Sequence, residues 1–123
     1  MGAKILIVDD DPDISGLIQG ELVKLGYEVS TLDGGEEVMG ALRSGRPDLL
    51  IMDVMLPGVD GYSLTNSIAD DPALRDIPVI IMSALSTSRV MFETLKPVHA
   101  FFSKPFSTEE LLAAVKSALA KQQ

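Results

Sequence analysis

The sequence has no cysteine and only one histidine among its 123 residues. The absence of cysteine excludes disulfide bonds, thiolate metal sites and a cysteine nucleophile. We interpret the single histidine, His99, as a surface or packing residue, so a conventional catalytic triad built on histidine is not expected.

Long apolar runs are absent too. No stretch approaches the roughly 20 apolar residues that cross a bilayer, and no basic-then-apolar leader opens the chain. The first six residues lack the Ser or Thr of a myristoylation signal. Linkers, low-complexity segments and internal repeats are not evident. We therefore expect a cytoplasmic protein without membrane association, folded as one domain over residues 1–123.

Positive charge is scarce. Lys and Arg number 10 against 18 Asp and Glu, and the formal net charge is −8. This balance disfavours direct nucleic-acid binding, which draws much of its affinity from cations that neutralise phosphates. Acidity alone can serve solubility, so its functional meaning depends on where the acids lie.

Short apolar runs alternate with longer segments of helical period. The apolar runs predict strands over residues 4–8, 27–32, 48–52, 79–82 and 100–103. The other segments predict helices from Pro12 to Gly26, over 35–45, 62–69 and 89–95, and after a capping box at Ser107–Glu110. Five such units predict an α/β fold, a doubly wound three-layer sandwich with a parallel sheet between helices.

Polar residues follow four of the predicted strands: Asp9 and Asp10, then Asp53, Ser83 and Lys104. Because the carboxyl ends of parallel strands meet at one edge of a sheet, we expect these side chains to converge. Each has an ordinary explanation alone, since acids cap helices and serines and lysines are common in loops. Their joint placement favours a shared site.

Three carboxylates in one small space repel one another and need compensating positive charge. A dication and the Lys104 ammonium supply it, and oxygen ligands favour Mg²⁺ over zinc or copper. A carboxylate such as Asp53 can also act as a nucleophile and form an aspartyl phosphate. With Ser83 as a hydrogen-bond donor, these residues predict phosphoryl transfer.

These residues resemble the response-regulator receiver domains of two-component signalling, over essentially the whole chain. The motifs that carry the similarity are Ile7–Pro12, Asp53–Gly61, Ile81–Ala84 and Lys104–Phe106. The resemblance implies a flavodoxin-like fold with strand order 2-1-3-4-5 and Asp53 as the phosphoacceptor. It also implies that Asp10, Asp53 and the backbone carbonyl of Met55 bind Mg²⁺ directly, while Asp9 acts largely through water.

The resemblance further implies a switch. Ser83 would bond the phosphoryl group, and Phe101 matches the aromatic residue that turns inward on activation. The bond between Lys104 and Pro105 is expected to be cis. The spacing from Ser83 to Lys104 is one residue shorter than the commonest family spacing, which leaves the extent of the fourth helix open.

The family's rate-tuning positions, Met55 and Leu85, are both apolar here and cannot orient a water molecule. We therefore hypothesise a phosphoprotein that hydrolyses slowly and is not an enzyme in the ordinary sense.

The implied donor is a phosphohistidine on a sensor histidine kinase or a histidine phosphotransfer protein. The expected docking residues are Ile14, Leu17, Pro105 and Phe106. Leu17 could instead belong to the core. The downstream target is unknown, and a weak homodimer could form through the fourth helix, fifth strand and fifth helix.

Other functions fit less well. Magnesium-dependent phosphatases typically carry a second Asp two residues after the nucleophile, where this chain has Met55. An acidic first loop would repel an FMN phosphate. The alternative that stays open is a phosphorylation-independent interaction module on the same fold, although such variants usually lose an acid or the lysine.

Overall fold

The computed structural model describes residues 2–56, 59–84 and 89–120. Its centre is a parallel sheet in the order β2-β1-β3-β6-β7. The strands are β1 Lys4–Val8, β2 Glu28–Leu32, β3 Leu49–Asp53, β6 Val79–Ser83 and β7 Val98–Ser103. Counted along the chain, this is the expected order 2-1-3-4-5, so the flavodoxin-like fold is confirmed.

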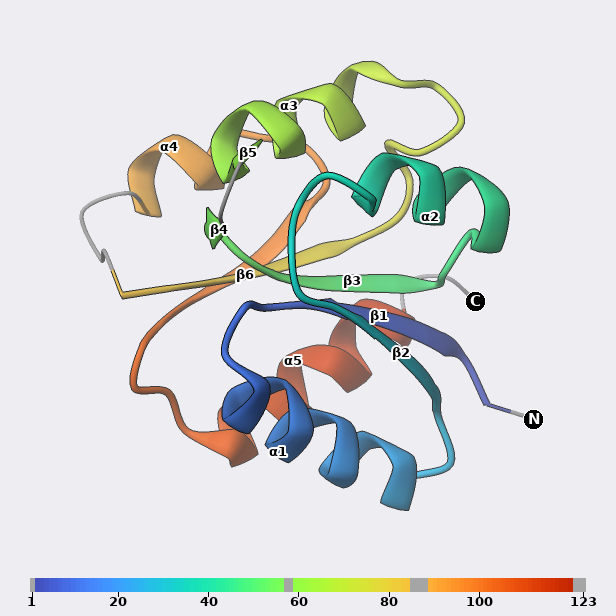
Figure 1. The fold of residues 1–123 in the computed structure, drawn as a ribbon, viewed down its shortest axis with the longest axis vertical. Helices are drawn as coiled ribbons and strands as arrows, with labels where there is room; N and C mark the ends of the chain where they lie inside the picture. The colour runs from blue at the N-terminus through green and yellow to red at the C-terminus, as the bar shows by residue number, and fades with distance from the viewer. Residues whose placement is uncertain (1, 57–58, 85–88, 121–123) are drawn as a thin grey trace.

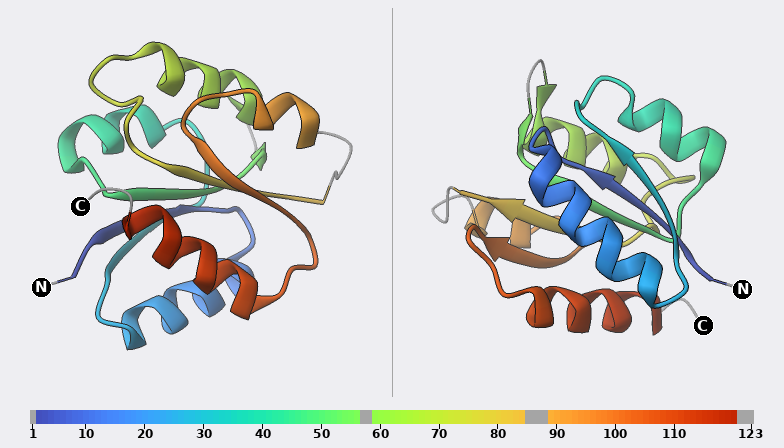
Figure 2. Two further views of the ribbon diagram at one scale, coloured as in Figure 1. Left: turned by 180° about the vertical axis from the view of Figure 1, so that it is seen from behind. Right: turned by 60° about the horizontal axis from the view of Figure 1, so that its bottom comes forward.

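Helices cover both faces of the sheet, which gives three layers (Figure 1). The helices are α1 Pro12–Lys24, α2 Val38–Gly45, α3 Gly61–Asp70, α4 Arg89–Glu93 and α5 Thr108–Ala120. The two views of Figure 2 agree that α1 and α5 lie on one face and α2, α3 and α4 on the other. Within the described ranges, no helix is both long and apolar enough to span a membrane.

Each face of the sheet has its own hydrophobic core, and β3 contributes to both. Leu49 and Ile51 pack with residues of α1 and α5, whereas Leu50 and Met52 pack with residues of α2 and α3. Side chains of a strand alternate between the two faces, and both faces are covered here. This double burial explains why the strand is a continuous apolar run in the sequence.

The structure differs from the expected elements at four points, the first of which is β7, which begins at Val98, two residues before its expected start at residue 100. A short antiparallel hairpin of β4 Met55–Leu56 and β5 Val59–Asp60 follows β3, where we expected only a loop. The second helix begins at Val38 and not at residue 35, because residues 36 and 37 form a turn in which the Val38 N–H donates to the Gly35 carbonyl at 3.2 Å. The fourth helix ends at Glu93, two residues early, and a tight turn that reaches Pro97 leads directly into β7.

Acids that follow strands also start helices. The Asp11 carboxylate accepts a hydrogen bond of 2.9 Å from the Asp13 backbone N–H and caps α1. Asp60 caps α3 in the same way. At α5, the Ser107 hydroxyl accepts a bond of 3.3 Å from the Glu110 N–H, as the capping box predicts. The caps fix the directions in which α1 and α3 leave the functional edge of the sheet.

Candidate phosphoacceptor site

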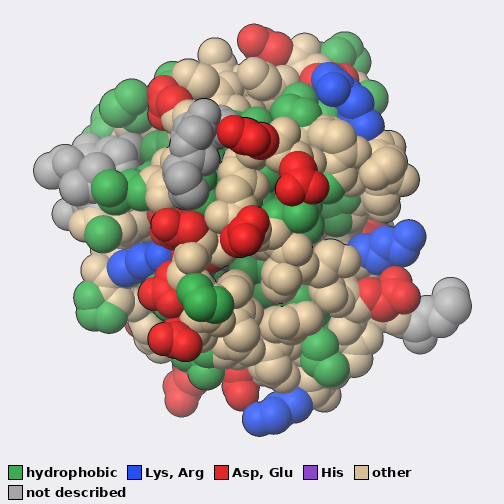
Figure 3. Space-filling model, viewed as in Figure 1, with side chains coloured by type: hydrophobic (Ala, Val, Ile, Leu, Met, Phe, Trp, Pro, Cys, Tyr) green, Lys and Arg blue, Asp and Glu red, His purple; other side chains and the backbone are tan. Residues whose placement is uncertain are grey.

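Strand register brings Asp9 and Asp53 side by side. Val8 pairs with Met52 in neighbouring strands, so the next residues, Asp9 just after β1 and Asp53 at the end of β3, lie at the same level. This point lies between β1 and β3, where the chain reverses its direction across the sheet, and ligands of such folds bind at this switch point. Acidic side chains gather over this edge, on the left of the molecule in Figure 3.

The three predicted acids form one cluster. Asp9 and Asp53 are only 2% and 5% exposed, while Asp10 is exposed. Each contributes a carboxylate oxygen, and these oxygens lie within 4.8 Å of one another. An open hollow of about 450 Å³ borders Asp9 and Asp10 on the side of Thr31 and Asp33. The hollow reaches Asp9 and Asp10, whereas Asp53 and Lys104 are not part of its lining.

Lys104 joins the two buried acids. Its Nζ donates to Asp53 Oδ2 at 2.7 Å and to Asp9 Oδ2 at 2.9 Å. Burial acts to lower the pKa of Lys104, but its hydrogen bonds to Asp53 and Asp9 outweigh burial and leave this pKa above the ordinary value. The side chain is therefore an ammonium ion over the physiological pH range.

The second oxygen of each buried acid is held by the backbone. Asp53 Oδ1 accepts from the Met55 N–H at 2.9 Å, and Asp9 Oδ1 accepts from the Asp11 N–H at 2.9 Å. In each carboxylate, one oxygen thus accepts a hydrogen bond from a backbone N–H and the other accepts one from Lys104. This fixes the orientation of the two carboxylates before any ligand binds.

Ser83 lies beside this cluster. It ends β6, is fully buried, and its carbonyl oxygen accepts from the Lys104 N–H at 2.8 Å. Pairing between β6 and β7 therefore holds Ser83 and Lys104 next to each other. The bond between Lys104 and Pro105 is cis, as the resemblance implies.

The predicted switch residue Phe101 is buried under α4. Its ring lies 6.0 Å from the Phe92 ring, which contacts the Tyr62 ring of α3 at 5.5 Å. Phe101 of β7 thus contacts α4 directly and is linked to α3 through Phe92. Leu85, the second rate-tuning position, lies outside the described residues.

The four expected docking residues divide into two pairs. Leu17 is 54% exposed and Pro105 is also exposed, so the interpretation of Leu17 as a core residue is wrong. Ile14 and Phe106 are half-buried and pack against the core beneath α1 and α5. The exposed part of this surface therefore depends mainly on Leu17 and Pro105.

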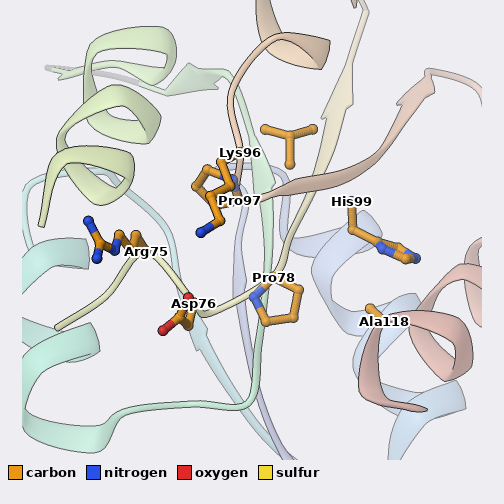
Figure 4. Close-up of a pocket in the computed structure, with 8 residues that line it drawn as sticks. Arg75, Asp76, Pro78, Lys96, Pro97, His99 and Ala118 are labelled. Carbon is orange, nitrogen blue, oxygen red and sulfur yellow. The ribbon is translucent and has the colours of Figure 1, made fainter. Parts of the chain in front are cut away.

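A separate hollow of about 290 Å³ lies at the opposite edge of the sheet (Figure 4). It borders Pro78 and Pro97, which precede β6 and β7, and its lining includes Arg75, Lys96 and His99. The predicted phosphoacceptor residues do not contribute to this lining. His99 Nε2 lies 3.2 Å from the Ser117 hydroxyl.

The sequence indicates no separate role for Gly61 beyond its place in the motif Asp53–Gly61. In the structure it lies against the backbone of Val54, directly after Asp53. A glycine at the first position of a helix, directly after the Asp60 cap, was the available signal. That signal does not identify the neighbouring backbone.

Comparison with known proteins agrees with this geometry. The family model of the response regulator receiver domain matches residues 5–116. The response regulator PleD of Caulobacter vibrioides is 35% identical over 118 residues, which are 95% of this chain and 26% of PleD. The transcriptional regulator RpaA of Synechocystis is 35% identical over 117 residues, or 94% of this chain and 48% of RpaA. The chain thus spans between a quarter and a half of these relatives.

Solved structures show the same fold. A response regulator from Chloroflexus aurantiacus has a TM-score of 0.89 at 32% identity, covering 98% of this chain and 99% of that one. The response regulator TrrA of Thermotoga maritima, in complex with Mg²⁺ and BeF, has a TM-score of 0.84 at 34% identity, with coverages of 97% and 100%. Fold and site define a protein of the doubly wound α/β class with an acidic pocket at its switch point. The chain belongs to the response regulator receiver domain family.

Proposed function

We propose that this chain is a phosphorylatable signalling switch that accepts a phosphoryl group on Asp53 in a Mg²⁺-dependent reaction. The observation that carries the proposal is the Lys104 ammonium, which bridges Asp53 and Asp9 in a cluster of three carboxylates. Residues 1–123 would act together as a single receiver unit.

The cluster suits a hard dication because all its donor atoms are oxygens and Lys104 offsets only one of three negative charges. Asp10, Asp53 and the Met55 carbonyl would hold Mg²⁺ directly, with Asp9 acting through water. Bound Mg²⁺ would neutralise charge on the phosphoryl oxygens. The Mg²⁺ complex of TrrA, a relative by fold and sequence, supports this assignment.

The ionised Asp53 carboxylate needs no base to act as a nucleophile. One of its oxygens forms a bond to phosphorus while the bond from phosphorus to the donor's imidazole nitrogen breaks, and that nitrogen keeps the electron pair. The Lys104 ammonium can then pair with a phosphoryl oxygen, and the Ser83 hydroxyl can donate a hydrogen bond to another. The protein contributes mainly position and charge.

The donor would be a phosphohistidine on a sensor histidine kinase or a histidine phosphotransfer protein. Exposed Leu17 and Pro105, with the outer parts of Ile14 and Phe106, form an apolar surface beside the acids. Apolar residues with a polar rim are typical of transient interfaces. This surface would seat the donor so that its phosphohistidine faces Asp53.

Phosphorylation would alter the face of α4, β7 and α5 through Ser83 and Phe101. Phe101 contacts Phe92 of α4, so a movement of β7 at Phe101 reaches this helix directly. Val90 and Met91 of α4 are exposed and available to a target or to a second copy in a weak homodimer. The phosphorylated and unphosphorylated states would then differ in the surface that they present to a partner.

A direct test uses the purified chain, Mg²⁺ and acetyl phosphate, with intact mass as the readout. We expect one added phosphoryl group on the wild type and none on Asp53→Asn. Chelation of Mg²⁺ should also prevent the addition. If the wild type gains no phosphoryl group under saturating Mg²⁺, the phosphorylation-independent interaction module becomes the better description.

A further inference from the structure

Gly61 lies in unusually close contact with the backbone that follows the phosphoacceptor. It is the first residue of α3 and is buried. A Cβ atom at this position would lie 2.6 Å from both the Cα and the carbonyl oxygen of Val54, and 2.9 Å from its Cβ. Ordinary contacts of a Cβ atom are 3.4–4 Å. The crowding involves backbone atoms, which cannot rotate away as a flexible side chain can.

The turn of residues Asp53, Val54 and Met55 is held firmly on its other sides. The Val54 N–H donates to the Met82 carbonyl in β6 at 3.2 Å. The Met55 N–H donates to Asp53 Oδ1 at 2.9 Å. Met55 also pairs with Asp60 across the β4–β5 hairpin. A displacement of the Val54 backbone would therefore also displace Asp53 and Met55.

The start of α3 is equally fixed. Asp60 Oδ1 accepts from the Tyr62 N–H at 3.1 Å, and Asp60 Oδ2 accepts from the Ser63 hydroxyl at 3.0 Å. The Gly61 carbonyl accepts from the buried Thr65 hydroxyl at 2.8 Å. The helix is anchored further along by Leu64 and Ile68 in the core. A shift of α3 away from Val54 would break these contacts.

We propose that Gly61 is a positioning residue for the phosphoacceptor turn. The absence of a side chain allows α3 to close against Val54, and this contact sets the positions of the Asp53 carboxylate and the Met55 carbonyl relative to Mg²⁺. The inference rests on the proposed function, because it assigns these two groups to the metal. Groups that orient metal ligands typically contribute on the order of tenfold or more to metal affinity.

The experiment compares Gly61→Ala with the matched variant Gly40→Ala. Gly40 lies in α2, and a Cβ atom there would meet nothing within 4 Å. Mg²⁺ affinity is measured by calorimetric titration of the whole chain, and thermal unfolding is followed in parallel. We expect Gly61→Ala to raise the Kd for Mg²⁺ on the order of tenfold. Gly40→Ala should leave the Kd unchanged and raise the Tm, because alanine favours a helix more than glycine does.

Labelling by acetyl phosphate gives a second readout. The Gly61→Ala variant should be labelled slowly at low Mg²⁺ and recover toward the wild-type rate at saturating Mg²⁺. A purely structural role of Gly61 would lower the Tm without this dependence on Mg²⁺. A cooperatively folded Gly61→Ala protein whose Kd for Mg²⁺ stays within about twofold of wild type would overturn the proposal, since positioning effects are on the order of tenfold.

A second pair of variants keeps the test decisive if Gly61→Ala does not fold. Asp60→Ala and Asp60→Asn both remove the charge, but only asparagine keeps an oxygen that can cap α3. We expect Asp60→Ala to bind Mg²⁺ more weakly than Asp60→Asn, and equal affinities would overturn the proposal. If the wild-type protein itself binds no Mg²⁺, the proposed function fails. If the wild type binds Mg²⁺ and the variants bind it equally well, only the positioning role of Gly61 fails.

Discussion

Lys104 Nζ and Asp53 Oδ2 are 2.7 Å apart, although 51 positions separate the two residues in the chain. The same ammonium contacts Asp9 at 2.9 Å. Because both acids are nearly buried, this one cation compensates charges that could otherwise persist only at a high energetic cost. Asp9 and Asp53 are thus already held together by Lys104, and Asp10 is the exposed member of the acidic cluster.

Lys104→Met should destabilise the protein in the absence of metal by about 2 kcal/mol, because two buried carboxylates lose their charged partner. Chemical denaturation in the presence of a chelator measures this difference. Addition of Mg²⁺ should recover part of the lost stability, since a dication can replace the missing positive charge. Equal stability of variant and wild type in chelator would contradict this account of the ion pair.

The same variant gives a pH test. The pKa of Lys104 is raised in the folded protein above the ordinary value of 10.5, because its bonds to Asp53 and Asp9 outweigh its burial. The folded state therefore binds this proton more tightly, and the contribution to stability is complete below pH 10.5 and is lost as the pH rises through the higher folded pKa. The difference in unfolding free energy between wild type and Lys104→Met should therefore shrink as the pH rises above 10.5. A constant difference would show that the ammonium is not the stabilising species.

The sequence predicted the sheet well because buried parallel strands leave a direct trace in the chain. The runs before Asp9, Asp53 and Ser83 are apolar without interruption, and each was predicted within one residue of its observed bounds. Convergence of the acids then follows from the fold, since parallel strands share one carboxyl edge. The predicted positions of the site residues needed no knowledge of side-chain contacts.

The sequence does not predict the short hairpin, the Gly61 contact or the end of the fourth helix, and each has a physical reason. A hairpin of two-residue strands such as β4–β5 has too few side chains to show a period of two. The contact of Gly61 with Val54 depends on how closely α3 approaches the turn, which no local pattern encodes. The end of the fourth helix at Glu93 depends on the turn that leads to Pro97. Packing distances of this kind arise only in the folded chain.

Substitution of Asp10 should weaken Mg²⁺ binding without lowering the stability of the metal-free protein. Asp10→Asn removes one of three clustered carboxylates, so the variant should be at least as stable as wild type in chelator. Mg²⁺ at 100 times its Kd should stabilise wild type by about 2.7 kcal/mol and the variant far less. Thermal unfolding with and without Mg²⁺ measures both effects. A Mg²⁺-induced rise in Tm that is the same in both proteins would exclude Asp10 as a ligand.

Leu17 offers a test of the docking surface. Its side chain is 54% exposed, so Leu17→Ala should leave stability nearly unchanged. Transfer from a phosphorylated histidine donor should slow by about tenfold, the effect of losing about 1.4 kcal/mol of contact energy. Labelling by acetyl phosphate should not change, because a small donor needs no docking surface.

Val23→Ala is the matched control for this docking test. Val23 is 53% exposed on the same helix, but it lies near the opposite end from the acids. It should transfer at the wild-type rate. Equal slowing by the two variants would point to a general effect of α1, and no slowing by Leu17→Ala would place the donor elsewhere.

We predict that Met55 slows the loss of the proposed phosphoryl group from Asp53. The side chain lies two residues after Asp53, is 52% exposed and is apolar, so it cannot orient an attacking water. Met55→Asn combined with Leu85→Asn should shorten the half-life of the phosphorylated protein by about tenfold, or about 1.4 kcal/mol of barrier. Decay is followed by intact mass after removal of acetyl phosphate. Met91→Asn, which alters a methionine with 51% exposure on α4, should keep the wild-type half-life. An unchanged half-life in the double variant would show that water access is set by the rest of the pocket.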